Sequence, residues 1–140
     1  MERDTRQRRA IRKVLEAAGR PLSPQEILEG ARRQAPTLGP ATVYRTLRAL
    51  ADEGWLTPVT LPGEPARYEP AGKTHHHHFR CRGCDRLFEV EGCRQASVAK
   101  APRGFVIEDH EVVWYGRCAR CARVKHPTER RERVVLRRGA

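Results

Sequence analysis

The sequence predicts an α+β protein in which a helical N-terminal unit is followed by a small α/β unit with an antiparallel sheet. Three observations support this division. Apolar residues recur at helical spacing before residue 54, whereas β-branched and aromatic residues are enriched in short runs after residue 74. Between the two patterns lies the small, polar stretch Ala-Gly-Lys-Thr at residues 71–74, which has the composition of a hinge.

Two helices are expected near the N-terminus. The first covers residues 5–19, where the apolar side chains fall on one face and Gly19 ends the element. The second begins with a capping box, because Ser23 and Glu26 can each accept a hydrogen bond from the other's backbone N–H. Pro24 at the first helical position strengthens this start.

The third helix is expected over residues 40–54, and a hairpin follows it. Its buried stripe consists of Val43, Leu47 and Leu50. The polar side that remains carries Thr42, Tyr44, Arg45 and Arg48. Two extended runs then flank Pro-Gly-Glu-Pro at 62–65, the pattern of a β-hairpin. Three helices and a hairpin indicate a winged helix-turn-helix, whose third helix would enter the major groove of DNA.

The composition favours a nucleic-acid partner and a reducing compartment. The net charge of +11 and the pI of about 10.3 indicate a polyanion, here double-stranded DNA. A generic helical bundle with solvated arginines is the alternative, and the charge and the hairpin count against it. No long apolar run predicts a membrane span or a signal peptide. Five cysteines, an odd number, suit metal binding in a cytoplasmic protein better than a disulfide framework.

The second unit is expected to contain three strands and one short helix. The strand-like runs are residues 75–81, 86–91 and 105–118, and the helix is expected at 94–101. The chain then ends in a charged stretch that forms either a short helix or a disordered basic tail.

Two Cys-x-x-Cys pairs are the most specific motif of the chain. They are Cys81 with Cys84 and Cys118 with Cys121. Four thiolates can surround one tetrahedral zinc ion and leave no open position, which makes such a site structural rather than catalytic. It would supply folding free energy to a domain with little core. The alternative is two unrelated reduced pairs.

Four consecutive histidines precede the first cysteine pair. The run is internal, which disfavours an expression tag. On a strand, His75 and His77 would point one way and His76 and His78 the other, so one run can serve two metal sites. The candidates to complete these sites are Glu69, Glu89, Cys93 and His110. His126, in the charged tail, is given no role.

Together these motifs resemble the ferric uptake regulator family of bacterial metal-sensing repressors. The segments that carry the resemblance lie within about residues 5–121 and read ATVYRTLRAL, RYE, HHHHFRCRGC, FEV and CARC. The resemblance implies a winged helix, an α/β dimerisation domain, and a homodimer on an A·T-rich inverted repeat. The implied boundaries are 1–70 for the DNA-binding domain, 71–74 for the hinge, 75–122 for the metal-binding dimerisation domain and 123–140 for a basic tail.

The resemblance also implies roles for individual residues. The structural zinc ligands are Cys81, Cys84, Cys118 and Cys121. The ligands of the regulatory site, for Zn, Fe or Mn, are Glu69, His76, His78 and Glu89. The further site is formed by His75, His77 and His110. Among the residues of the third helix, the resemblance places Tyr44 and Arg45 against DNA.

The chain departs from the family pattern at two positions. Pro21 stands where a histidine ligand of the regulatory site is expected. Cys93, with Glu91 nearby, lies in the region where the further site often takes a glutamate, so Cys93 is included in that site. A thiolate there would favour zinc over Fe²⁺ or Mn²⁺.

Two other classes of function compete with a repressor. A zinc hydrolase would use the histidines with a bound water, but the sequence has no HExxH motif and leaves Glu89 as the only base. A metal buffer would not need the winged helix or the basic charge. The expected protein is therefore not an enzyme, has no small-molecule substrate and does not bind membranes.

Overall fold

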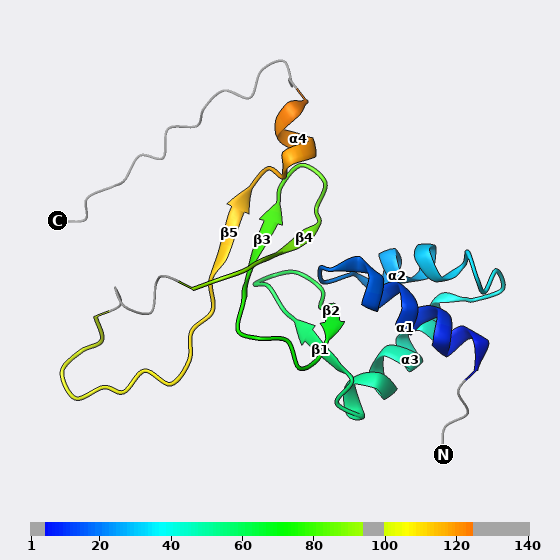
Figure 1. Cartoon of the computed structure of the whole chain (residues 1–140), viewed down its shortest axis with the longest axis horizontal. Helices are drawn as coiled ribbons and strands as arrows, with labels where there is room; N and C mark the ends of the chain where they lie inside the picture. The colour runs from blue at the N-terminus through cyan, green and yellow to red at the C-terminus, as the bar shows by residue number, and fades with distance from the viewer. Residues whose placement is uncertain (1–4, 94–99, 125–140) are drawn as a thin grey trace.

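The computed structural model describes residues 5–93 and 100–124, and two groups of elements follow each other along the chain (Figure 1). The first group is α1 (Arg6–Ala18), α2 (Pro24–Ala31), α3 (Pro40–Asp52), β1 (Leu56–Val59) and β2 (Arg67–Pro70). The second group is β3 (His77–Cys81), β4 (Leu87–Val90), β5 (Val113–Gly116) and α4 (Ala119–Arg123).

The helix ends follow the local signals of the sequence. Thr5 caps α1 by accepting a hydrogen bond from the backbone N–H of Arg8, and Gly19 ends the helix in the left-handed conformation with φ of 62°. Ser23 and Glu26 form both hydrogen bonds of the predicted capping box at the start of α2. The positions of all three predicted helices are confirmed.

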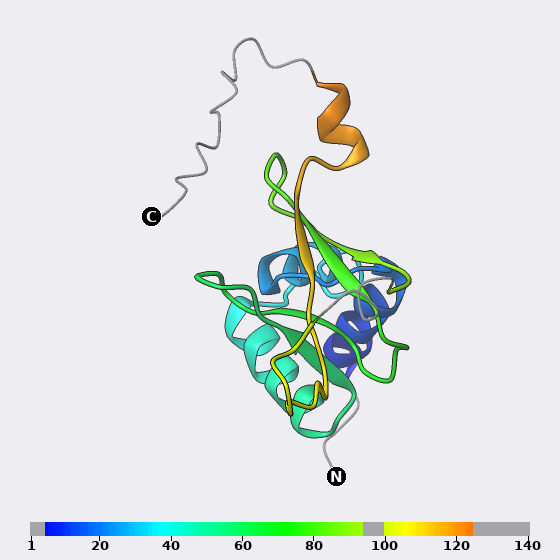
Figure 2. The same cartoon turned by 90° about the vertical axis from the view of Figure 1, so that its left-hand side faces the viewer.

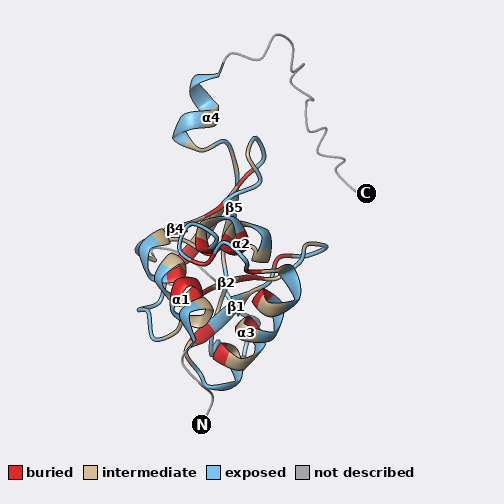
Figure 3. Cartoon of the chain, turned by 90° about the vertical axis from the view of Figure 1, so that its right-hand side faces the viewer, coloured by how far each residue is buried: buried red, intermediate tan, exposed pale blue. Residues whose placement is uncertain are grey.

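The core of the N-terminal unit lies between α1, α2 and α3 (Figure 3). Its largest fully buried side chains include Ile11, Leu15 and Ile27, together with the predicted stripe of Val43, Leu47 and Leu50. β1 and β2 form the predicted antiparallel hairpin, with Leu56 paired to Pro70 and Val59 to Arg67. Leu22, before α2, adds a bridge to Tyr68 of β2, so the hairpin is attached to the helices.

The second sheet has the order β4-β3-β5. β3 and β4 are antiparallel, as expected, whereas β5 runs parallel to β3 and makes the sheet mixed. α4, which the sequence did not predict, lies at the end of this sheet remote from α3 (Figure 1, Figure 2). In the described part of the chain, no helix has the length and apolar character to cross a membrane.

The predicted strand at 105–118 is wrong over residues 105–112. Phe105, Val106 and Ile107 are 71%, 84% and 53% exposed and have no strand partner among the described residues, so β5 begins only at Val113. A strand needs a neighbour for its backbone groups, which local composition cannot supply. Most of the predicted helix at 94–101 and nearly all of the predicted tail lie outside the described residues.

Candidate metal centres

Three groups of metal-binding side chains lie in the described part of the chain. Within each group the donor atoms lie no more than 4.8 Å from one another. The cysteine group is Cys81, Cys84, Cys118 and Cys121; the hinge group is Glu69, His76 and His78; the Cys-His group is His75, His77, Cys93 and His110. The histidine run thus contributes alternate side chains to two groups, as a strand-like backbone requires.

The cysteine group has the spacing of a four-thiolate zinc site. Zn–S bonds of about 2.3 Å place two sulfurs of a tetrahedral site about 3.8 Å apart. The Cys84 and Cys118 sulfurs are 3.9 Å apart. Gly83 allows Cys121 to approach this pair of strands, because a Cβ at position 83 would lie 2.9 Å from both Cβ and Sγ of Cys121.

The protonation of these thiols also fits a metal site. The backbone N–H of Cys118 donates to Cys81 Sγ at 3.3 Å, and the N–H groups of Cys84 and Gly83 add to it. These donors outweigh the effect of burial and lower the pKa of the Cys81 thiol to about 6. Hydrogen bonding with the Cys118 side chain, and burial, raise the pKa of Cys121 to about 12. Four thiolates can therefore coexist here only around a cation.

The hinge group connects the wing to the second sheet. Glu69 lies on β2, His78 on β3, and His76 in the segment between them. His76 Nδ1 lies 2.8 Å from the Thr74 carbonyl oxygen, which can only accept, so the proton is assigned to Nδ1. The lone pair on Nε2 of the neutral ring then faces the Glu69 carboxylate, 2.9 Å away. Two acceptors this close need a cation or a second ring proton between them.

A second ring nitrogen of the hinge group also lies near Glu69. His78 Nε2 is buried, has no hydrogen-bond partner among the described residues, and lies 3.6 Å from Glu69 Oε2. Burial acts to raise the pKa of Glu69, but His78, His76 and Lys73 outweigh it and hold the pKa below its ordinary value. A charged, buried carboxylate beside two imidazoles is a suitable donor set for a divalent cation.

Glu89, which the resemblance places in the same site, lies outside the hinge group. It is the register partner of His78 across the β3–β4 ladder. Its carboxylate accepts a hydrogen bond from Lys73 Nζ at 2.7 Å, and the same nitrogen lies 3.8 Å from Glu69 Oε2. Lys73, in the segment between β2 and β3, therefore lies between two carboxylates.

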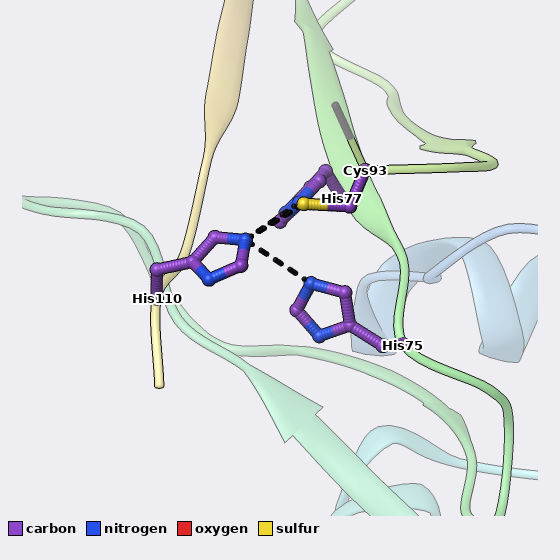
Figure 4. Close-up of side chains that lie close together, drawn as sticks. All are labelled: His75, His77, Cys93 and His110. Atoms are coloured by element: carbon purple, nitrogen blue, oxygen red, sulfur yellow. Dashed lines mark hydrogen bonds between the residues drawn. The ribbon is translucent and has the colours of Figure 1, made fainter. Parts of the chain in front are cut away.

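The Cys-His group crowds three side chains around one ring nitrogen (Figure 4). His110 Nε2 is 3.2 Å from His77 Nε2, 3.3 Å from His75 Nε2 and 2.9 Å from Cys93 Sγ. A ring nitrogen has either one proton or one lone pair, so hydrogen bonding can satisfy only one of these contacts. Burial, and then the neighbouring rings, lower the pKa of His77 and favour its neutral, metal-binding form.

The distances in this group match tetrahedral coordination. Zn–N bonds of about 2.0–2.1 Å place two nitrogens of a tetrahedral site about 3.3–3.4 Å apart, close to the separations of 3.2 and 3.3 Å around His110. A cavity of about 420 Å³, lined by the histidine run and by parts of residues 57–61 and 109–113, gives ions a route to both histidine groups.

The third helix presents the predicted polar face. Tyr44 is 60% exposed, Arg45 and Arg48 are exposed, and Thr42 is half-buried. Arg45 Nη2 donates to Thr42 Oγ1 at 3.2 Å, which holds the guanidinium along the helix surface. This face has the exposed guanidinium, phenol and hydroxyl groups that contact bases and phosphates.

Comparison with known proteins agrees with this combination of a winged helix and metal-binding groups. The model of the ferric uptake regulator family matches residues 2–115. The chain belongs to the ferric uptake regulator family. The ferric uptake regulation protein of Campylobacter jejuni is 31% identical over 122 residues, covering 84% of this chain and 78% of that one. The zinc uptake regulation protein of Mycobacterium tuberculosis is 34% identical over 122 residues, covering 85% of this chain and 94% of that one.

Solved structures of the ferric uptake regulator family share the fold. The Helicobacter pylori ferric uptake regulator has a TM-score of 0.67 and 28% identity, and covers 89% of this chain and 85% of that one. A zinc-bound manganese uptake regulator has a TM-score of 0.73 and 26% identity, covering 83% and 90%. The protein is thus a metal-responsive, DNA-binding transcriptional regulator and not an enzyme, in a family whose members bind zinc, iron or manganese and act as dimers. The predicted family, fold class and regulatory function are confirmed.

In this member of the ferric uptake regulator family, Pro21 cannot take the place of the expected histidine, because its side chain has no atom that can bind a metal. Its side chain is fully buried. The adjacent Arg20 lies over the ring of Phe88 on β4, with 5.7 Å from the guanidinium carbon to the ring centroid, and also pairs with Glu26. The segment before α2 therefore contacts the second unit through a cation–π interaction.

Four charged residues, called here the wing clamp, also join the two units: Glu64, Arg67, Arg80 and Asp85. Glu64 lies in the wing turn and pairs with Arg67 at 2.7 Å and with Arg80 of β3 at 2.9 Å. Arg67 also donates to the carbonyl of Asp85, next to Cys84, at 2.9 Å. Sequence reasoning missed the clamp, because nothing local indicates that these distant segments meet.

Proposed function

We propose that this regulator represses metal-homeostasis genes by binding an A·T-rich inverted repeat as a homodimer when its regulatory metal is bound. The observation that carries the proposal is the position of the hinge group. Glu69 belongs to the wing, whereas His78 belongs to the sheet of the second unit. One ion held by both side chains would link the DNA-binding unit to the unit that forms the dimer.

This link would control the angle between the two recognition helices of a dimer. An inverted repeat presents its half-sites at a fixed spacing, about 34–36 Å for one helical turn. An ion that fixes the angle raises operator affinity without adding base contacts, with a coupling free energy of about 1–3 kcal/mol. Base and phosphate contacts are assigned to Thr42, Tyr44, Arg45 and Arg48.

The cysteine group is assigned to a structural zinc. Zinc bound there would supply folding free energy to the second unit, and the closed set of four thiolates leaves no position for a substrate. The sulfur spacing, the backbone N–H donors to Cys81 and the close approach at Gly83 support this assignment.

The Cys-His group is assigned to a further metal site that stiffens the second unit. All of its donors, His75, His77, Cys93 and His110, lie on the C-terminal side of the hinge. The Helicobacter pylori regulator is described as having three functional metal-binding sites, and this chain offers three donor groups among its described residues.

The dimer partner is proposed to cover the apolar residues next to β5. Phe105, Val106 and Ile107 are largely exposed, and Trp114 and Tyr115 of the same segment are 37% and 44% exposed. A cluster of large exposed apolar side chains marks an interface, and a second copy of this chain presents the same cluster in return.

The test is operator binding by protein that keeps zinc in the cysteine group but has no other metal. Zn²⁺, Mn²⁺ and Fe²⁺ are added in turn, and at least one is expected to raise the affinity by about 5–150-fold. His76→Ala should abolish this rise and His75→Ala should reduce it less, because only the hinge group spans the two units. Arg45→Ala should weaken operator binding and leave metal binding unchanged.

Two results would count against the proposal. If neither His76→Ala nor His75→Ala alters the response, the histidine run is not the sensor. If no metal produces operator binding, the chain is better described as a metal buffer. A larger loss from His75→Ala than from His76→Ala would exchange the roles of the two histidine groups.

A further inference from the structure

We propose that Lys73 is a tethered cation that competes with the regulatory metal for the hinge group, and so sets the metal concentration at which the regulator responds. The inference rests on the proposed function in one respect only, that the hinge group binds a divalent ion.

The position of Lys73 is the first argument. Its Nζ atom is 2.7 Å from Glu89 Oε2 and 3.8 Å from Glu69 Oε2. Glu69 comes from the wing and Glu89 from β4, so the ammonium group joins the two units across the hinge. A metal ion in the hinge group would make the same kind of connection.

The charge of the hinge group is the second argument. The Glu69 side chain is only 6% exposed, and a buried carboxylate needs a cation or hydrogen-bond donors. The two imidazoles beside it can be metal ligands only as neutral rings. Among the described residues, Lys73 is the lysine or arginine close to Glu69, so it is the cationic side chain there that is not itself a candidate metal ligand.

Metal and lysine cannot both keep their contacts. A divalent ion bonded to Glu69 would repel an ammonium group held beside the same carboxylate. Any role of Glu89 as a ligand would, in addition, require the loss of its 2.7 Å contact with Lys73. Metal binding therefore displaces Lys73. The free energy lost with the ion pairs of Lys73 reduces the net binding free energy of the metal.

This arrangement gives Lys73 a regulatory effect that a surface ion pair would not have. In the metal-free state the lysine holds the hinge by a weak, single positive charge. In the metal-bound state a divalent ion with three or four ligands replaces it. The difference in strength between these two links determines the metal threshold, so a change at Lys73 shifts the threshold without removing a ligand.

The test measures Mn²⁺ binding directly. The protein carries zinc in the cysteine group together with the His75→Ala and His110→Ala substitutions, which leave the Cys-His group only two donors. Free Mn²⁺ is followed by its electron paramagnetic resonance signal. Lys73→Met, which keeps most of the length of the side chain and removes its charge, is expected to lower the Kd for Mn²⁺ by about 2–5-fold. Lys73→Arg should stay near the parent value.

Controls separate this inference from the proposed function. Lys100→Met removes an exposed charge that lies outside the hinge group and should leave the Kd unchanged. If His76→Ala abolishes Mn²⁺ binding but Lys73→Met leaves the Kd unchanged or raises it, the hinge group binds metal and Lys73 is not its competitor. If His76→Ala has no effect on Mn²⁺ binding, the proposed sensing site is wrong and the inference is overturned with it.

Discussion

Cys93 places a sulfur atom in a group that otherwise contains only imidazole nitrogens. Its Sγ lies 2.9 Å from His110 Nε2, so the thiol is directed at the same point as the three histidines. Thiolate and imidazole together suit zinc, whereas Mn²⁺ and Fe²⁺ bind better to sites with carboxylate ligands. If both groups bind metal as proposed, this one residue would give the Cys-His group a different metal preference from the hinge group, whose third donor is a carboxylate.

Cobalt can report on this sulfur. When zinc fills the cysteine group and Co²⁺ is added, the Cys-His group is expected to show a thiolate-to-cobalt charge-transfer band in the near ultraviolet. Cys93→Ser should remove the band but keep the visible absorption of bound Co²⁺, because three imidazoles remain. His76→Ala should keep the band. A band that persists in Cys93→Ser would mean that the cobalt ion giving the band is bound to thiolates of the cysteine group instead.

The turn between β3 and β4 shows how an element prepares a metal site. Two backbone N–H groups of this turn, those of Gly83 and Cys84, point at Cys81 Sγ, and Gly83 lets the chain pass close to Cys121. Asp85 completes the turn in the left-handed conformation, with φ of 62°. Such a turn orients the first cysteine pair before the second pair arrives from β5 and α4.

Gly83→Ala is therefore expected to weaken zinc retention. The new Cβ would lie 2.9 Å from Cys121 Cβ and Sγ, so the fourth ligand must move. Zinc release to a chromophoric chelator should become faster by about 10–100-fold, the range seen when the surroundings of a metal ligand are altered. Gly39→Ala, where nothing lies within 4 Å of the new Cβ, is the control and should release zinc at the parent rate.

The elements that the sequence predicted well are those with local causes. Capping by Ser23 and Glu26 and the left-handed Gly19 can be recognised in a few consecutive residues. β5 was predicted too long because its extent depends on pairing with β3, which is distant in the sequence.

The same distinction holds for the site. The alternation of the histidines is local and was predictable. The hydrogen bond from Lys73 to Glu89 and the contact of Arg20 with Phe88 join residues that are distant in the sequence. Lysine, arginine and glutamate are also usually solvated at the surface, so their types do not indicate such contacts. Family resemblance placed Glu89 with the metal ligands, but it could not anticipate a lysine that this chain carries in its hinge.

At the scale of the whole molecule, the wing clamp and the hinge group are two separate connections between the units. Hydrogen bonds from Arg80 and then Arg67 lower the pKa of Glu64 and outweigh its burial. A lowered pKa in the folded state means that the stabilising contribution is complete at neutral pH and is lost only as the pH falls below about 4.5. The clamp is thus fully charged under ordinary conditions and does not depend on metal.

Removing the charge of Glu64 should loosen the hinge. Glu64→Gln is expected to accelerate trypsin cleavage after Lys73 at neutral pH in the metal-free protein, because both arginines lose their carboxylate partner. Glu16→Gln, an exposed change on α1, should have no effect. Equal cleavage rates in Glu64→Gln and the parent protein would show that the clamp does not hold the two units together.

The run of four histidines has a consequence for how the chain folds. A slip of β3 by one residue exchanges the two faces of the strand. Because the four residues His75–His78 are identical, such a slip would still present both imidazoles to one metal site and one imidazole to the other, so ions bound there distinguish the correct pairing from the shifted one only in part. The stronger distinction comes from Cys81, buried at the end of the strand. Zinc bound to the cysteine group would then select the correct register of the strand. Refolding with zinc added before Mn²⁺ should therefore give more native dimer than the reverse order.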